Sequence, residues 1–102
     1  MGCSPRLDFN TQYETVAVSQ SDQVIGGVGA IGDLLERVVV SVATAATATC
    51  SIKDGSGSAI TLTAANTPIG VYTVELGIRS SSGAWKVTTG AGATAIAVGK
   101  FT

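Results

Sequence analysis

Residues 47–63 read TATCSIKDGSGSAITLT, and this stretch decides the fold class. Before the turn, Cys50 and Ile52 alternate with threonine and serine, which is the pattern of a strand with one buried face. After the turn, Ile60 and Leu62 repeat that alternation. The Asp-Gly-Ser-Gly between the two halves is typical of a β-hairpin turn. The stretch therefore predicts two antiparallel strands joined by a tight turn, with Ile60 and Leu62 facing inward.

Similar short alternating segments lie on both sides of this hairpin. Turn-forming clusters of glycine and serine recur roughly every 8 to 12 residues, a spacing typical of antiparallel sandwiches and barrels. We expect further strands at residues 14–20, 71–76, 85–89 and 94–101. In each of them apolar side chains share one face: Val16 and Val18; Tyr72, Val74 and Leu76; Trp85 and Val87; and Ile96 and Val98, which we expect to face inward.

Residues 33–42, DLLERVVVSV, allow two interpretations. The first half could open a helix that is capped by Asp33. The valines that follow are β-branched, which favours a strand and costs helix stability. We expect a strand in which the even-numbered residues of 34–42 share one face. The odd-numbered residues, Leu35 and Val39 among them, are expected to share the other.

The whole pattern predicts an all-β fold, a small antiparallel β-sandwich that is jelly-roll-like. At 102 residues a single domain is expected, and we place it at residues 13–102. Residues 1–12 show no periodicity, so we expect an extended N-terminal arm with apolar points at Leu7 and Phe9. The glycine-rich residues 26–32 form either a loop or a bulge, and the sequence leaves both open.

The residue types present argue against an enzyme. The chain has no histidine, and only 13% of its residues are charged. Without histidine a serine or cysteine nucleophile lacks its usual base, and two cysteines alone cannot complete a zinc site. We therefore predict no catalytic residues, no metal site and no cofactor.

One motif matches a dinucleotide-binding fingerprint. Residues 27–32, GVGAIG, have the G-x-G-x-x-G order, and Asp54 follows about twenty residues later. That motif binds a pyrophosphate between a buried parallel strand and the N-terminus of a helix. Here polar residues precede the motif and the valine run follows it. A loop without nucleotide binding is therefore the better interpretation.

Charge and glycine content bear on the partners. The net charge is −1 and the six basic residues are scattered, which gives no footprint for nucleic acid. No apolar run reaches the ~18 to 20 residues of a membrane span. Thirteen glycines raise the entropy lost on folding, and small cores often gain stability by association, so we expect a homo-oligomer. Trp85 is either a core residue or an interface anchor, and Tyr72 is a second interface candidate.

Five stretches that lie in turns and strands carry a resemblance to a known family: GGVGAIGDLL at 26–35, SIKDGSGSAI at 51–60, LGIRS at 76–80, GAWKVTTG at 83–90 and IAVGKFT at 96–102. They resemble small proteins that tailed bacteriophages encode beside their major capsid genes. The resemblance implies a capsid decoration (cement) or head-fibre protein with a β-sandwich fold and a trimeric assembly.

The resemblance also implies a role and partners. The protein would oligomerise on the surface of the capsid and stabilise the head, as part of a virion assembled in the host cytoplasm. Its partner would be the major capsid protein, which the arm would contact through Arg6, Leu7 and Phe9. An alternative is a receptor- or glycan-binding module of a head or tail fibre, which would use exposed aromatics such as Trp85 or Tyr72. We expect neither nucleic acid nor membrane as a partner.

Overall fold

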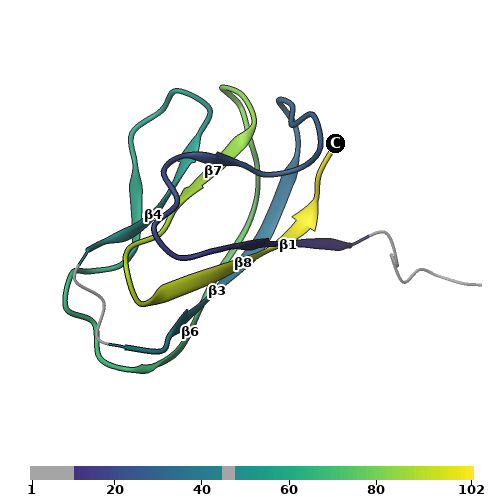
Figure 1. The fold of residues 1–102 in the computed structure, drawn as a ribbon. Coiled ribbons are helices and arrows are strands. Elements are labelled where there is room, and N and C mark those ends of the chain that lie inside the picture. Colours follow the sequence, from purple (N-terminus) through teal and green to yellow (C-terminus); the bar gives the residue numbers. More distant parts are fainter. Residues whose placement is uncertain (1–10, 45–47) are drawn as a thin grey trace, which may run out of the picture.

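The protein folds as a β-sandwich in a computed structural model that describes residues 11–44 and 48–102. Two antiparallel sheets of four strands each face one another (Figure 1). The described residues contain no helix, which confirms the all-β prediction. In chain order the strands are β1 (Gln12–Val16), β2 (Gln23–Val24), β3 (Leu34–Val42), β4 (Cys50–Asp54), β5 (Ile60–Thr63), β6 (Gly70–Arg79), β7 (Trp85–Thr88) and β8 (Ala93–Lys100).

The β4–β5 hairpin is the centre of the topology. β4 pairs with β5, β3 with β6, β2 with β7 and β1 with β8, so the strand pairs are nested about the turn that joins β4 to β5. This ribbon is rolled up so that the first sheet has the order β1-β8-β3-β6 and the second has the order β2-β7-β4-β5. The arrangement is that of an eight-stranded jelly roll, which confirms the predicted fold class.

Side chains from both sheets fill the space between them. The largest is Trp85 at the start of β7, and its side chain is 1% exposed. Tyr72 and Leu76 pack against the core from β6, at the edge of the first sheet. The buried hydrophobic residues are Val16, Ile25, Leu35, Val38, Val40, Val42, Cys50, Ile52, Trp85, Val87, Ala93, Ala95 and Ala97. Burying one Val or Leu side chain contributes about 1.5–3 kcal/mol, so this layer is the main source of stability.

β3 confirms the strand predicted for residues 33–42 but corrects the assignment of its faces. Its pairing with β8 jumps from Leu35 to Arg37, which leaves Glu36 as an extra residue in a β-bulge. One extra residue shifts the alternation by one position. Leu35 therefore faces the core together with Val38, although regular alternation places them on opposite faces.

The inward face predicted for β8 is wrong. Ala95 and Ala97 are buried, whereas Ile96 and Val98 lie on the outer side of the sheet. The reason is the neighbouring strand: the register sets Ala97 beside the buried Val38, and it sets Ala95 beside another buried valine. Close packing favours small residues beside large ones, so the alanines fill the inner positions.

One predicted strand is shorter than expected, and one side chain predicted to face inward is exposed. β1 ends at Val16, and the chain then turns through Ser19, whose φ is +57°, so Val18 lies outside the strand and is 45% exposed. Ile60 pairs with the buried Ile52 but is 44% exposed. Its strand, β5, is at the edge of the second sheet, so no further strand covers it.

The glycine-rich residues 26–32 form a loop that carries the chain from β2 in the second sheet to β3 in the first. Gly26, Gly29 and Gly32 have φ angles of +98°, +73° and +94°, which glycine adopts without steric cost. The backbone N–H of Val28 donates to the Thr102 carbonyl at 2.9 Å and so holds the loop in place.

Candidate interaction surface

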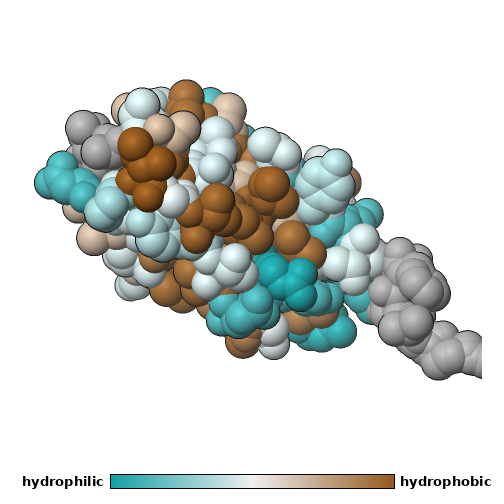
Figure 2. Space-filling model, turned by 90° about the horizontal axis from the view of Figure 1, so that it is seen from below, coloured by the Kyte–Doolittle hydropathy of each residue, from teal (hydrophilic) through white to brown (hydrophobic). Residues whose placement is uncertain are grey.

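Side chains that point away from the core gather on the outer face of the first sheet. β1 places Tyr13 beside Val98 of β8, and β8 places Ile96 beside Val39 of β3. β6 adds Val71 at the far edge. Figure 2, which views the molecule from the side of this sheet, shows hydrophobic residues gathered on its surface. We refer to these five residues as the apolar face.

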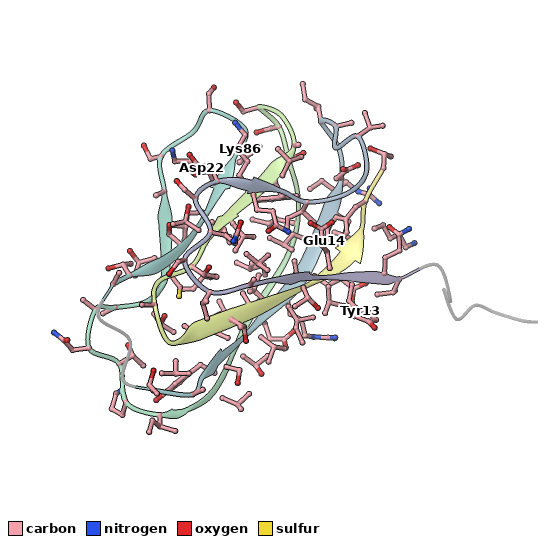
Figure 3. The ribbon with its side chains drawn as sticks, viewed as in Figure 1. Tyr13, Glu14, Asp22 and Lys86 are labelled. Carbon is pink, nitrogen blue, oxygen red and sulfur yellow. The ribbon has the colours of Figure 1, made fainter. Side chains whose placement is uncertain are left out.

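The apolar face is open at its edges and half-covered at its centre. Tyr13 is 72% exposed and Val71 is 69% exposed, whereas Ile96 between them is half-buried by its neighbours. Figure 3 shows Tyr13 pointing away from the sandwich, while the next residue, Glu14, points toward the second sheet. A two-layer antiparallel fold commonly turns polar faces to water, so an apolar outer face is a candidate site of contact with another molecule.

The outer face of the second sheet is polar by comparison. Its register places Lys53 beside Lys86 and Ser51 beside Thr88. Asp22 forms an ion pair with Lys53, with an N···O distance of 3.4 Å. Asp22 and Lys86 both lie on this side of the molecule (Figure 3). The two outer faces thus differ in kind, and only the second has the composition of a water-exposed sheet.

Charged residues lie at one end of the apolar face. Arg37 Nε donates to Glu75 Oε2 at 3.3 Å across the β3–β6 pairing, and Arg37 Nη2 lies 3.8 Å from Glu36 Oε1. Lys100 lies two residues after Val98 and on the same side of β8. Both ion pairs are exposed and add little stability. Arg79 pairs with Leu34 at the same end, so two acidic and three basic groups gather there.

Two turns of similar sequence lock together at one end of the sandwich. The Asp54 carboxylate accepts hydrogen bonds from the backbone N–H of Ser82 at 3.0 Å and from that of Ser81 at 2.9 Å. These backbone N–H groups hold the pKa of Asp54 below its ordinary value of 3.8, and the N–H of Ser82 has the largest effect. In return the N–H of Gly55 donates to the carbonyl of Ala84 at 3.0 Å. The turns bond to one another, so they form a structural lock.

Asp33 is a buried carboxylate that joins three parts of the fold. Its side chain accepts from the backbone N–H of Ala30 at 3.1 Å and from the N–H and hydroxyl of Thr102, each at 3.2 Å. Its backbone carbonyl accepts the indole N–H of Trp85 at 2.9 Å. A buried carboxylate needs several donors to offset lost hydration, and here the fold supplies them. Asp33 is therefore a structural residue.

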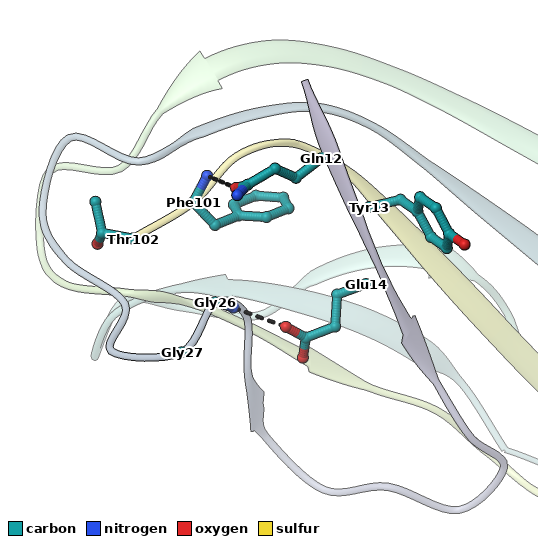
Figure 4. Close-up of a pocket in the computed structure, with 7 residues that line it drawn as sticks. All are labelled: Gln12, Tyr13, Glu14, Gly26, Gly27, Phe101 and Thr102. Atoms are coloured by element: carbon teal, nitrogen blue, oxygen red, sulfur yellow. Dashed lines mark hydrogen bonds between the residues drawn. The ribbon is translucent and has the colours of Figure 1, made fainter. Parts of the chain in front are cut away.

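A shallow pocket of about 260 Å³ lies where β1, the glycine-rich loop and the last residues meet (Figure 4). Glu14 Oε1 accepts from the Gly26 N–H at 2.8 Å, and its Oε2 accepts from Gln23 Nε2 at 2.8 Å. Gln12 Oε1 accepts from the Phe101 N–H at 2.9 Å. These groups tie β1 to the second sheet and to the chain after β8. The pocket lining is Gln12, Tyr13, Glu14, Gly26, Gly27, Phe101 and Thr102.

The residues predicted to form the site are placed as follows. Arg6, Leu7 and Phe9 lie outside the described residues. Tyr72 turns toward the core from β6, and its hydroxyl donates to the Pro68 carbonyl at 2.7 Å. Trp85 is enclosed in the core and belongs to the other sheet. The structure does not bring the two aromatics together on a common surface.

The apolar face escapes prediction from the sequence because its members look like core residues. Ile96 and Val98 are more hydrophobic than the alanines that alternate with them, so hydrophobicity alone assigns them inward. A usable signal was present: Ala93, Ala95 and Ala97 have the same spacing and are as apolar as a small inner row requires. An inner row of alanines leaves Ile96 and Val98 for the outer side of β8.

Within residues 11–44 and 48–102, the structure does not bring together the side chains of a metal site or the strand and helix of a dinucleotide site. This part of the chain holds no group of three or more His, Cys, Asp or Glu side chains placed to bind a metal ion. The G-x-G-x-x-G stretch leads into the strand β3, so the helix that would receive a pyrophosphate is not there.

The comparisons with known proteins add no neighbour: no family model, no curated protein and no solved structure matches the chain. Among the residues that the structure describes, no helix is both long and apolar enough to cross a membrane.

Proposed function

We propose that the protein is a structural component of a bacteriophage virion. It acts as a capsid decoration (cement) protein that forms a trimer on the capsid surface and stabilises the head. Its partner is the major capsid protein, and it is assembled into the virion in the host cytoplasm. The observation that carries the proposal is the apolar face, an outer sheet surface suited to protein contact.

Two further observations support this role. Five stretches of the sequence resemble proteins encoded beside phage capsid genes, and the jelly roll is a fold used by viral capsid proteins, although fold by itself does not determine function. The buried carboxylate Asp33 and the partly buried Glu14 are bonded within the fold, which suits a scaffold. A protein repeated over a lattice also needs only modest affinity per copy, because many contacts act together.

The N-terminal arm is the proposed capsid-binding element, with Arg6, Leu7 and Phe9 as contacts. The bounds of β1 set where a truncation of the proposed arm should end. Gln12 is the first residue of β1, and its side chain is bonded to Phe101, so it belongs to the folded domain. Removal of residues 1–10 therefore leaves the eight described strands at their full length.

Deletion of residues 1–10 is expected to abolish binding to capsids while the fold is kept. Purified protein is mixed with capsids that lack it, and the pelleted fraction is measured by sedimentation. The full-length chain should pellet with capsids, and the truncated chain should stay in solution with an unchanged circular dichroism spectrum. Full-length Asn10→Ala, which keeps the proposed contacts, should pellet like the wild type. Equal pelleting of the truncated and full-length chains would refute the arm as the binding element.

A glycan-binding module of a fibre is the competing function, and the structure gives it less support. Sugar recognition commonly uses an exposed aromatic ring, but the two rings expected to serve, Trp85 and Tyr72, are enclosed in the core and packed against it. Tyr13 is exposed, and it belongs to the apolar face. Lectins share the jelly roll, so the fold itself does not separate the two functions. A full-length protein that binds a glycan on an array and fails to bind capsids would replace the proposed function with this one.

A further inference from the structure

We propose that the apolar face is the surface through which copies of this chain associate, the apolar face of one copy packing on that of a second. The inference rests on the proposed function, because it assigns the contact that forms the oligomer. In a trimer the three apolar faces turn toward the shared axis, and each is divided between its two neighbours. The occupant of the face is thus another copy of the same sheet.

The size of the face is sufficient for such a contact. Four strands spaced about 4.8 Å apart and about eight residues long at 3.3 Å each give a face of ~500 Å². Faces that are fully covered by other copies then bury ~1,000 Å² in a pair and ~1,500 Å² in total in a trimer, at or above the lower limit for a specific protein interface. The first sheet reaches this area only when its whole outer side is used, so the contact requires a partner as broad and flat as the sheet. Another copy of the sheet has that shape.

The composition of the face follows the anatomy of an interface. Ile96 and Val39 lie side by side on the two central strands, and Val98 is next to them. Hydroxyl residues surround this centre, with Thr94 and Ser41 paired at one end and the ion pair of Arg37 at the other. Protein interfaces commonly have an apolar centre with a polar rim.

Charge allows a second copy on this face. Its charged end combines two acidic side chains, Glu36 and Glu75, with three basic ones, Arg37, Arg79 and Lys100, so opposite charges can meet across the contact. The outer face of the second sheet carries Lys53 and Lys86, and bringing two such faces together would place like charges in contact.

The test is the mass of the full-length protein in solution, measured by analytical ultracentrifugation over a dilution series without capsids. Wild type is expected to be an oligomer. Ile96→Lys places an ammonium group at the centre of the apolar face and should weaken association by roughly 30-fold or more, the loss expected at an interface hot spot. The double variant Val39→Thr/Ile96→Thr keeps β-branched side chains in both strands and should weaken it as well.

The matched control is Thr61→Lys, which adds the same charge at an exposed position of β5 in the second sheet. Its mass should equal that of the wild type. Trp85 is buried in the native fold, so its fluorescence emission reports in every variant whether the fold is kept. A wild type with the mass of one chain at all concentrations would overturn the inference, as would folded Ile96 variants that remain fully associated.

The two proposals fail in different ways. A wild-type monomer that pellets with capsids would overturn the self-contact and keep the capsid-binding part of the proposed function. A wild-type oligomer that is dissociated by Ile96→Lys but never pellets with capsids would support the self-contact and remove the capsid function.

Discussion

At the scale of single residues, Gly99 has no room for a side chain. It lies opposite Leu35, where the bulge in β3 brings the two backbones together. A methyl group at this position would overlap the carbonyl oxygen of Leu34. The obstacle is backbone, which cannot rotate away as a flexible side chain can. The bulge that turns Leu35 into the core therefore requires glycine on the neighbouring strand.

Gly99→Ala is expected to lower the free energy of unfolding by about 1–3 kcal/mol, because the two central strands of the first sheet must move apart. Urea unfolding followed by Trp85 fluorescence measures the change. Gly27→Ala is the control, since the nearest atom to an added methyl there is the Thr102 carbonyl oxygen at 4.0 Å, an ordinary contact. Equal stability of the two variants would show that the bulge does not constrain residue 99.

Asp54 links stability to pH through the lock between the two turns. Its carboxylate form accepts the N–H groups of Ser82 and Ser81, and so its pKa in the folded protein lies below 3.8. The unfolded chain then binds the proton more readily than the folded one. The stabilisation is fully present above pH 3.8 and is lost as the pH falls through the lower, folded-state pKa.

Asp54→Asn is expected to be less stable than the wild type at pH 7, because an amide replaces one acceptor oxygen by a donor. The difference should shrink as the pH falls well below 3.8, where the wild-type carboxyl is also uncharged. Urea unfolding of both proteins at pH 7 and at low pH measures it. A difference that stays constant with pH would contradict the role given to the carboxylate.

At the scale of strands, alternation predicts where a strand lies better than which face it buries. The β4–β5 hairpin and β7 lie where the sequence indicates, because glycine and serine turns bound them. The face of β8 is inverted, since the valines of β3 beside it decide which side chains fit. The bulge at Glu36 depends on pairing with a strand more than sixty residues away, and no local pattern marks it.

One buried hydrogen bond joins β7 to the start of β3. The indole N–H of Trp85 reaches the Asp33 carbonyl just before β3 begins. Trp85→Phe removes this buried bond and part of the ring, and should cost about 2–4 kcal/mol. Tyr72→Phe is the control, because it removes an exposed bond to Pro68 and should cost under ~1 kcal/mol. Thermal unfolding followed by circular dichroism compares them, and equal losses would contradict the role assigned to the indole.

At the scale of the whole molecule, the jelly roll could be predicted in class but its functional surface could not. Turn spacing and alternation are local properties, and they suffice for an all-β sandwich. The apolar face is assembled from β1, β3, β6 and β8, which the nested pairing brings side by side from distant parts of the chain. Tyr13 and Val98 become neighbours only in that arrangement.

The contrast between the outer faces of the two sheets has a consequence for the surface that an assembly of copies would expose. If the apolar faces pack together, the outer face of the second sheet, which bears lysine and hydroxyl side chains, becomes the exterior surface of the oligomer. Such a surface stays hydrated and offers little apolar area for nonspecific binding by other proteins. Each copy would then cover the surface on which the oligomer lies, as well as bind its neighbouring copies.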